Sequence, residues 1–210
     1  MTQRHHDPHR DWLEGAILVG MRVRDATAAD WAAVWPILLE AGVEGTTLTW
    51  DPAMTEDRAR TGWMRQPPGQ TVVAVTDEGT VVGSAYYRPL HGGPGSHVAN
   101  AGFVVHSGRR REGIGRALCE HVLDRARADG YRAMVFQSVV ETNEPAVRLW
   151  RSCGFEIIAT VPAAFLHPTD GYVGLHIMHR RLWPVAASAE TADPGARSGR
   201  WEDHDAGPDR

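Results

Sequence analysis

The sequence predicts an α/β fold in which a mixed β-sheet is covered by helices on both faces. The first observation is that short runs rich in β-branched residues alternate with segments whose apolar residues recur every three or four positions. The second is the order of these segments, β-α-α-β-β-β-α-β-α-β-β, which is typical of a layered α/β domain. The third is composition: 210 residues, 42% hydrophobic and 23% charged, fit one globular domain and exclude collagen, a coiled coil and wholesale disorder.

A strand and a helix come first in the domain. Residues 21–26 form the strand, and Thr27 or Asp30 begins the helix, which we expect to end near Glu40. Pro36 lacks an amide hydrogen, so it should kink this helix or mark an irregular end. The apolar side chains recur at helical spacing: Trp31, Val34, Trp35 and Leu38.

A second helix and a hairpin follow. A connection rich in glycine and threonine, residues 42–50, leads to a helix over 55–65, and Pro67-Pro68-Gly69 ends it. Two β-branched runs, 71–75 and 80–88, are separated by a short turn with a glycine, which is typical of a β-hairpin.

Strands and helices alternate in the second half of the domain. A Gly/Pro loop precedes it, and Gly130 and Gly154 end its two helices. The expected elements are strand 98–105, helix 113–129, strand 134–140, helix 143–153, and strands 155–161 and 171–181.

The two ends of the chain differ from this middle part. Residues 1–20 contain three histidines and show no clear period, so we expect a flexible N-terminal extension. From Pro184 the chain is rich in Ala, Ser, Pro, Gly and Asp with few apolar residues, which predicts a disordered tail over 184–210. The folded domain is therefore expected over 21–183.

Charge, hydropathy and cysteine content narrow the function. A formal net charge of −4 excludes a global cationic surface for nucleic acid or anionic lipid. No apolar run approaches the roughly 18 residues that a membrane span needs, and the N-terminus is unlike a signal peptide. Cys119 and Cys153 have no His or Cys at metal-ligand spacing and are expected as reduced packing residues. We expect a cytoplasmic protein without a metal and without a membrane or nucleic-acid partner.

The most informative segment is 104–118, Val-Val-His-Ser-Gly-Arg-Arg-Arg-Glu-Gly-Ile-Gly-Arg-Ala-Leu. A strand enters a basic turn, and an amphipathic helix follows. Gly113 and Gly115 have no Cβ where the first-turn amides are unpaired, so a diphosphate can approach them, with arginines as counter-charge. The ATP-type phosphate loop needs a lysine, and the chain has none. A tight turn with solvated arginines is the alternative, and anion binding is favoured.

Two motifs resemble a known family. Arg110-x-x-Gly113-x-Gly115 resembles the pyrophosphate-binding motif of the GCN5-related N-acetyltransferase (GNAT) superfamily. The segment 143–155, Asn-x-x-Ala-x-x-Leu-Trp-x-x-x-Gly-Phe, is similar to its second signature. The resemblance covers about 21–183, and segment 46–50 looks closest to the phosphinothricin or amino-acid N-acetyltransferase branch.

The resemblance implies how acetyl-CoA binds. The cofactor would enter a V-shaped opening between two splayed central strands. Backbone groups of Val104 and Val105 would hold the pantetheine arm and polarise the thioester, and Asn143 would hydrogen-bond the same arm. The alternative for Asn143 is a helix N-cap, and both roles can hold together. The residues implied at the pyrophosphate are Arg110, Arg111, Gly113, Ile114, Gly115 and Arg116.

The sequence departs from the family pattern at two catalytic positions. Trp150 stands where many members have the tyrosine that protonates the CoA thiolate, and an indole is not a useful acid. Asn100 stands where this branch has a glutamate base, and it resembles an asparagine that faces the acceptor in relatives acting on small amino acids. A hydrogen-bonded core amide is the alternative for Asn100.

The residues that act as general base and general acid therefore have several candidates. His97, whose unperturbed pKa is near 6.5, is a candidate base, and Glu44, Glu141 or water are others. Tyr172, Cys153 or water could supply a proton to the thiolate, or no acid is needed, because a thiolate is a tolerable leaving group. We assign catalytic roles to Asn100, His97 and Asn143.

The sequence thus predicts an acetyl-CoA-dependent N-acetyltransferase that acts on a small amino acid or related metabolite by direct transfer. An N-terminal acetyltransferase of proteins or peptides is one alternative, and a catalytically weak acetyl-CoA-binding regulator is another. A small-molecule amine is the expected partner, no metal is expected, and a homodimer is left open.

Overall fold

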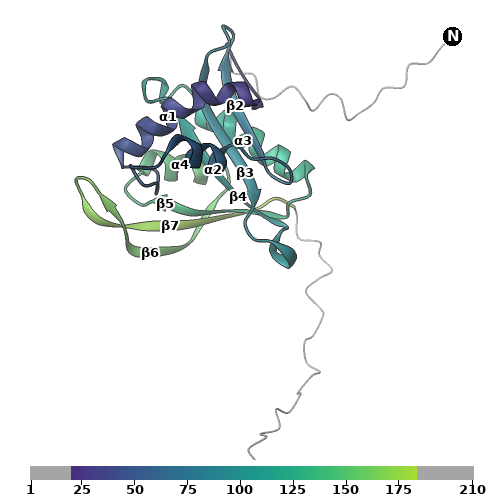
Figure 1. The fold of residues 1–210 in the computed structure, drawn as a ribbon. Helices are drawn as coiled ribbons and strands as arrows, with labels where there is room; N and C mark the ends of the chain where they lie inside the picture. The colour runs from purple at the N-terminus through teal and green to yellow at the C-terminus, as the bar shows by residue number, and fades with distance from the viewer. Residues whose placement is uncertain (1–19, 184–210) are drawn as a thin grey trace, which may run out of the picture.

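Seven strands form one mixed sheet in the computed structural model, which describes residues 20–183 (Figure 1). The strand order is β1-β2-β3-β4-β5-β7-β6, and only β4 and β5 are parallel neighbours. The strands are β1 (Met21–Asp25), β2 (Gln70–Thr76), β3 (Val81–Pro89), β4 (Val98–Val105), β5 (Ala133–Val140), β6 (Glu156–His167) and β7 (Gly171–Arg181).

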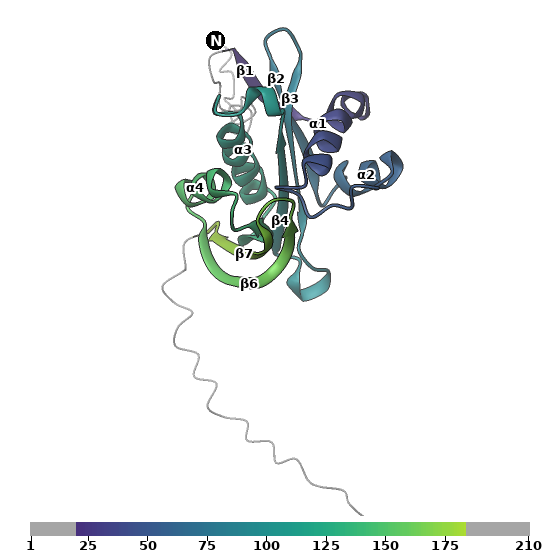
Figure 2. The same cartoon turned by 90° about the vertical axis from the view of Figure 1, so that its left-hand side faces the viewer.

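Helices cover both faces of the sheet, as Figure 2 shows with the sheet close to edge-on. Helices α1 (Trp31–Glu44) and α2 (Glu56–Trp63) lie on one face, and α3 (Ile114–Ala128) and α4 (Glu144–Ser152) lie on the other. Each face has its own apolar core, one centred on Trp63 and Val73 and the other on Leu118 and Met134. The predicted α/β fold class is therefore confirmed.

Helix α1 continues past the point where the sequence analysis ended it. The prediction of an end near Glu40 is wrong, because the helix includes Pro36 and runs to Glu44, with Gly45 in the left-handed conformation as its C-cap. Ile37 and Leu38 follow the proline and are buried against the sheet. Burial of such side chains contributes about 1.5–3 kcal/mol each, enough to offset the roughly 3 kcal/mol that a helix-interior proline costs.

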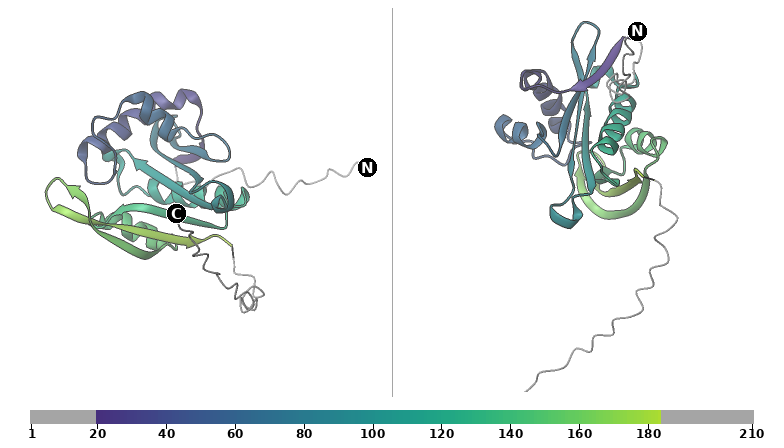
Figure 3. Two further views of the ribbon diagram at one scale, coloured as in Figure 1. Left: turned by 60° about the horizontal axis from the view of Figure 1, so that its bottom comes forward. Right: turned by 90° about the vertical axis from the view of Figure 1, so that its right-hand side faces the viewer.

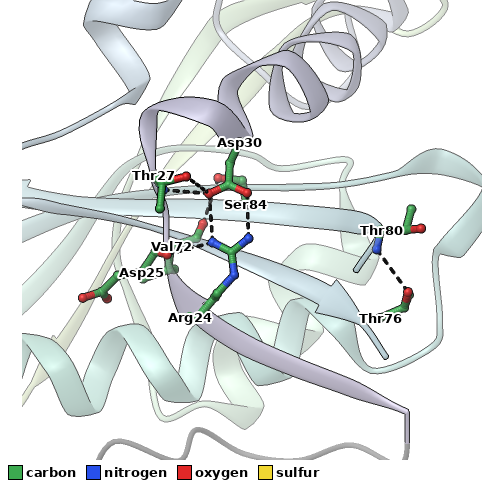
Figure 4. Close-up of polar contacts among 8 residues, drawn as sticks. All are labelled: Arg24, Asp25, Thr27, Asp30, Val72, Thr76, Thr80 and Ser84. Carbon is green, nitrogen blue, oxygen red and sulfur yellow. Dashed lines mark hydrogen bonds and ion pairs between the residues drawn. The ribbon is translucent and has the colours of Figure 1, made fainter. Parts of the chain in front are cut away.

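An ion pair fixes the connection between β1 and α1 (Figure 4). Both terminal guanidinium nitrogens of Arg24, Nη1 and Nη2, donate to the Asp30 carboxylate, at 2.8 and 2.7 Å. The backbone N–H and the hydroxyl of Thr27 donate to the same carboxylate, at 2.7 and 2.8 Å. The hydrogen bonds from Arg24 hold the pKa of Asp30 well below its usual range. The contact is structural, because it belongs to the turn that begins the helical segment.

The two central strands separate after a short parallel contact. β4 pairs with β5 only at Val98–Ala133, Ala99–Met134 and Asn100–Val135. β4 continues to Val105 along β3, while β5 continues to Val140 along β7. The predicted splay in the middle of the sheet is therefore present, and it begins directly after Asn100.

The last two strands form a long hairpin, green to yellow in the left panel of Figure 3, that extends past the other strands. The predicted end of the first of these strands at Val161 is wrong, since β6 runs to His167. Between Val161 and Phe165 the register shifts, and pairing with β7 then resumes. The bulge interrupts the apolar pattern on which the prediction relied.

The predicted flexible extension and disordered tail lie outside the described residues, apart from Gly20, and the domain boundaries stay a prediction. Within 20–183, no helix combines the length and the apolar composition that crossing a membrane would require.

Candidate active site

A pocket of about 270 Å³ lies where β4 and β5 separate. Its lining comes from the 47–50 segment, the end of α2, Tyr86 on β3, residues 100–103 of β4, residues 136–140 of β5, and α4. Asn100 and Asn143, two of the predicted catalytic residues, both line it.

Strand register shows which way Asn100 faces. Asn100 is the partner of Arg88 on β3, and directly paired residues lie on the same face of a sheet. Ser84, four residues before Arg88, accepts a hydrogen bond from the indole of Trp63 at 2.9 Å. Asn100 therefore faces the layer of α1 and α2, and it is only 9% exposed.

Three aromatic side chains form the wall of the pocket on this face. Trp50 contacts Trp63 edge-on with ring centroids 5.7 Å apart, and Trp63 contacts Tyr86 in the same way at 4.9 Å. The hydrogen bond from Trp63 to Ser84 locks the central ring. This side of the pocket is therefore lined by packed aromatic rings.

Two arginines lie beside the aromatic wall. The Arg65 guanidinium lies over the ring of Tyr86 at 5.3 Å, and Arg88 is two residues beyond Tyr86 on β3. The Nε atoms of both arginines are buried and have no partner among residues 20–183. Burial, together with the positive charge of Arg88, lowers the pKa of Arg65. Each of these two arginines therefore has an Nε–H group that donates no hydrogen bond within residues 20–183.

The opposite face of the pocket is an aromatic cluster. Trp150 of α4 lies 4.8 Å from Phe103 and 5.0 Å from Phe136 between ring centroids, and it is 8% exposed. It is thus a core residue that also lines the pocket. An indole N–H cannot act as an acid at this position.

The loop between β4 and α3 presents unpaired amides. Arg111 and Gly113 both have left-handed backbone, with φ of 70° and 82°, a conformation that disfavours any side chain at 113. The first hydrogen bond of α3 joins the N–H of Ala117 to the carbonyl of Gly113 at 3.0 Å. Within the described residues, no partner occupies the N–H groups of 111–116. Such an arrangement at a helix N-terminus attracts an anion.

Arginine side chains of this loop have acidic neighbours. Arg110 pairs with Glu44 at the end of α1, at 2.6 Å, and its hydrogen bonds lower the pKa of Glu44. Glu44 is therefore a stable carboxylate, which weakens it as a candidate base. Arg116 donates to the hydroxyl of Ser152 at 2.8 Å, which joins α3 to α4.

Asn143 begins α4. Its side-chain oxygen accepts a hydrogen bond from the N–H of Ala146 at 3.2 Å, so the N-cap alternative is present. The oxygen is used in this way, and the amide NH₂ is left for a ligand in the pocket.

The other proton-transfer candidates lie outside the pocket. His97 lines a second pocket, of about 560 Å³, with Asp129 and Tyr131, and its Nδ1 lies 3.0 Å from the carbonyl of Pro94. The structure thus brings Asn100 and Asn143 together and places His97 elsewhere. Glu141 accepts the N–H of Gly174 at 2.7 Å.

The two side chains considered as proton donors to the CoA thiolate, Tyr172 and Cys153, also do not line this pocket. Tyr172 is 75% exposed on β7. Cys153 is buried, and a hydrogen bond from Cys119 lowers the pKa of its thiol.

The sequence analysis missed five residues that shape the site. They lack a spacing signal, because each depends on which strands and helices meet in space. For the two arginines among them, the only signal in the sequence was the lack of an acidic residue close by in the chain. Tyr86, Gln137 and Ser138 line the pocket, and Arg65 and Arg88 lie next to Tyr86 outside its lining.

Comparison with known proteins decides the family. A family model described as the acetyltransferase (GNAT) family matches residues 31–155. This chain belongs to the GNAT family. The match spans more than half of the chain and includes both motifs that the resemblance rested on.

Two curated relatives of this GNAT protein are informative. The N-acetyltransferase aca1 of Schizosaccharomyces pombe is 32% identical over 111 residues, 52% of this chain and 53% of that protein, so the chain spans about half of its length. The L-methionine sulfoximine/L-methionine sulfone acetyltransferase of Pseudomonas paraeruginosa is 31% identical over 146 residues, 67% of this chain and 83% of that protein.

Solved structures agree with this assignment. A GCN5-related N-acetyltransferase from Kribbella flavida is 51% identical, with a TM-score of 0.76 over 77% of this chain and 98% of that chain. The structure of yncA from Salmonella typhimurium with its cofactor acetyl-CoA is 25% identical, with a TM-score of 0.68 over 80% of this chain and 96% of that chain. The predicted family and N-acetyltransferase class are confirmed, while the roles of individual residues stay predictions.

Proposed function

We propose that this N-acetyltransferase transfers the acetyl group of acetyl-CoA directly to the amine of a small amino acid. The observation that supports this acceptor is the pair Arg65 and Arg88. Two neighbouring guanidinium groups with buried, unpartnered Nε atoms lie next to Tyr86, which lines the pocket, although neither arginine is itself a lining residue. A carboxylate would accept several of their hydrogen bonds at once. A free amino acid carries that carboxylate one carbon away from its amine.

The loop between β4 and α3, which we call the phosphate loop, has open amides that suit the pyrophosphate of acetyl-CoA. Left-handed backbone at Arg111 and Gly113 leaves the N–H groups of 111–116 open, and these would hold the pyrophosphate. Val104 and Val105 continue β4 beyond its pairing with β5, so that edge of the strand is open to a pantetheine arm. Ile114, Gly115 and Arg116 would contribute first-turn amides.

The cofactor supplies an activated acetyl thioester, and the protein positions the amine against it. The Arg65–Arg88 pair would hold the carboxylate, and Asn100 would hydrogen-bond the acceptor at the point where the strands separate. The NH₂ group of Asn143 would donate to the cofactor arm. Fixing both reactants in this way contributes to the rate mainly through proximity and orientation.

The proton leaves the amine by way of water in this proposal. Among the described residues that line the pocket, none is a carboxylate or an imidazole. The logarithm of kcat/KM should therefore rise with pH up to the acceptor amine's own pKa. An inflection near the roughly 6.5 expected for histidine would instead support His97 as the base.

A thiol-release assay tests the proposed function. The panel would hold amino acids, the same amino acids with the carboxylate converted to carboxamide, polyamines and short peptides. We expect amino acids to exceed their carboxamides in kcat/KM by about tenfold or more, because loss of the charged partner leaves two arginines unpaired. A preference for peptides would favour an N-terminal acetyltransferase. No turnover, with acetyl-CoA still raising the Tm, would favour a regulator.

A further inference from the structure

Strand β5 contains a bulge at the active-site pocket. Phe136 pairs with Met178 and Val139 pairs with His176, so two residues of β5, Gln137 and Ser138, oppose a single residue of β7. A bulge of this kind changes the direction of side chains, and bulges are frequent next to active sites.

The bulge turns the side chains of Gln137 and Ser138 to the face of the sheet that α1 and α2 cover, which we call the acceptor face. Phe136 and Val139 belong to the core under α3 and α4. Gln137 and Ser138, between them, therefore both point to the other face, the one on which Asn100 lies. All three residues line the same pocket, which is consistent with this direction.

The two side chains have unused hydrogen-bonding groups. Gln137 and Ser138 are exposed, and neither side chain has a hydrogen bond to another residue within 20–183. A carboxamide offers two donors and an acceptor, and a hydroxyl offers one donor and two acceptor lone pairs. With Asn100, the site holds three neutral polar groups together.

We infer that Gln137 and Ser138 form a subsite for the acceptor's side chain, and that this side chain is neutral and carries both a donor and an acceptor, as a carboxamide or ureido group does. The inference rests on the proposed amino-acid acceptor. In the proposed function the Arg65–Arg88 pair is taken by the amino acid's α-carboxylate, and no residue that lines the pocket is charged, so a charged side chain would lack a counter-charge of its own. An apolar side chain would leave the polar groups unpaired. L-Glutamine is the simplest probe of the class.

The test compares kcat/KM for L-glutamine, L-methionine and L-glutamate. The three acceptors have similar length, and they differ in having an amide, an apolar thioether or a charge at the end. We expect the wild-type protein to prefer glutamine to both others by about tenfold, because a site built to hydrogen-bond a group rejects an analogue that lacks it. Gln137→Leu should lower the glutamine-to-methionine ratio about tenfold, and Ser138→Ala about threefold.

Gln66→Leu is the matched control, since Gln66 is exposed and does not line the pocket. Its ratio should equal that of the wild type, and acetyl-CoA should bind all variants with the same Kd. A wild-type preference for methionine or glutamate, or an unchanged ratio in Gln137→Leu, would overturn the subsite while leaving the amino-acid acceptor in place. No turnover of any amino acid would remove the proposed function itself, and this inference with it.

Discussion

The proposed cofactor half and the proposed acceptor half of the site are built differently. The cofactor half is nearly continuous in sequence: β4, the loop after it and the start of α3 lie within residues 98–116. Its unpaired groups are backbone amides. The proposed acceptor half joins side chains from separate parts of the chain: Trp50 and Gln137 line the pocket, and Arg65 and Arg88 lie next to its Tyr86.

This difference explains why one half can be generic and the other specific. Backbone amides at a helix N-terminus bind a diphosphate whatever the neighbouring side chains are. An acceptor is distinguished by the side chains that meet it, and these depend on strand register and on the packing of α2. Changes in the cofactor half should therefore affect binding of acetyl-CoA, and changes in the acceptor half should affect substrate choice.

The largest effect is expected from Gly113→Glu. The new side chain would meet left-handed backbone and place a negative charge among the open amides. Loss of two charge-assisted hydrogen bonds would raise the Kd of acetyl-CoA about 100-fold. Isothermal titration calorimetry measures the change. Gly79→Glu is the control, because Gly79 has a φ of 86° and lies at the β2–β3 turn. Equal Kd values in the two variants would contradict the assignment of the loop.

A second test separates the two halves through Arg88. Arg88→Gln should lower kcat/KM for amino acids about 30-fold, since a charged hydrogen-bonding partner of the carboxylate is lost. The Kd of acetyl-CoA should not change. Steady-state kinetics with an amino acid and with its carboxamide would show the loss only for the acid. Arg58→Gln, on the exposed side of α2, is the control. A similar loss with both acceptors would mean that Arg88 stabilises the fold.

Asn100→Ala tests whether Asn100 acts on the acceptor rather than on acetyl-CoA. Asn100 lies at the last paired position of β4 and β5, and it faces the acceptor layer. We expect about a tenfold fall in kcat/KM for the acceptor, through KM or kcat, with little change in acetyl-CoA affinity. Kinetics that equal those of the wild type would show that Asn100 is structural.

The smallest effect on the site is expected from Asp30→Asn, which touches neither half. The variant should lose about 2 kcal/mol of unfolding free energy at neutral pH, since hydrogen bonds to a charged group are lost. The folded-state pKa of Asp30 lies below the unfolded value near 3.9, so this stability is present above about pH 4 and is lost as the pH falls below it. Urea unfolding at pH 7 and pH 3 measures the difference, which should narrow at the lower pH. A constant difference would place its origin in packing, and catalysis at pH 7 should be unaffected.

The sequence predicted most of the secondary structure, and it located the loop between β4 and α3, where the N–H groups of 111–116 have no partner within residues 20–183. Local patterns sufficed there, because a strand, a basic glycine turn and an amphipathic helix follow one another in the chain. The errors fall where packing overrides a local signal. Burial of Ile37 and Leu38 carries α1 through Pro36, and pairing with β7 carries β6 past a bulge.

By itself the sequence determined the order of the elements, the glycine- and arginine-rich turn between β4 and α3, and the family resemblance, since each depends on residues that are neighbours in the chain. Only the tertiary structure decided which side chains come together at the pocket and next to it. It placed Asn100 at the point of splay and His97 in another pocket, and it brought Arg65 beside Arg88. It also turned Gln137 to the acceptor face through a bulge. The physical reason is that strand register and helix packing join residues distant in sequence, and no local pattern records those contacts.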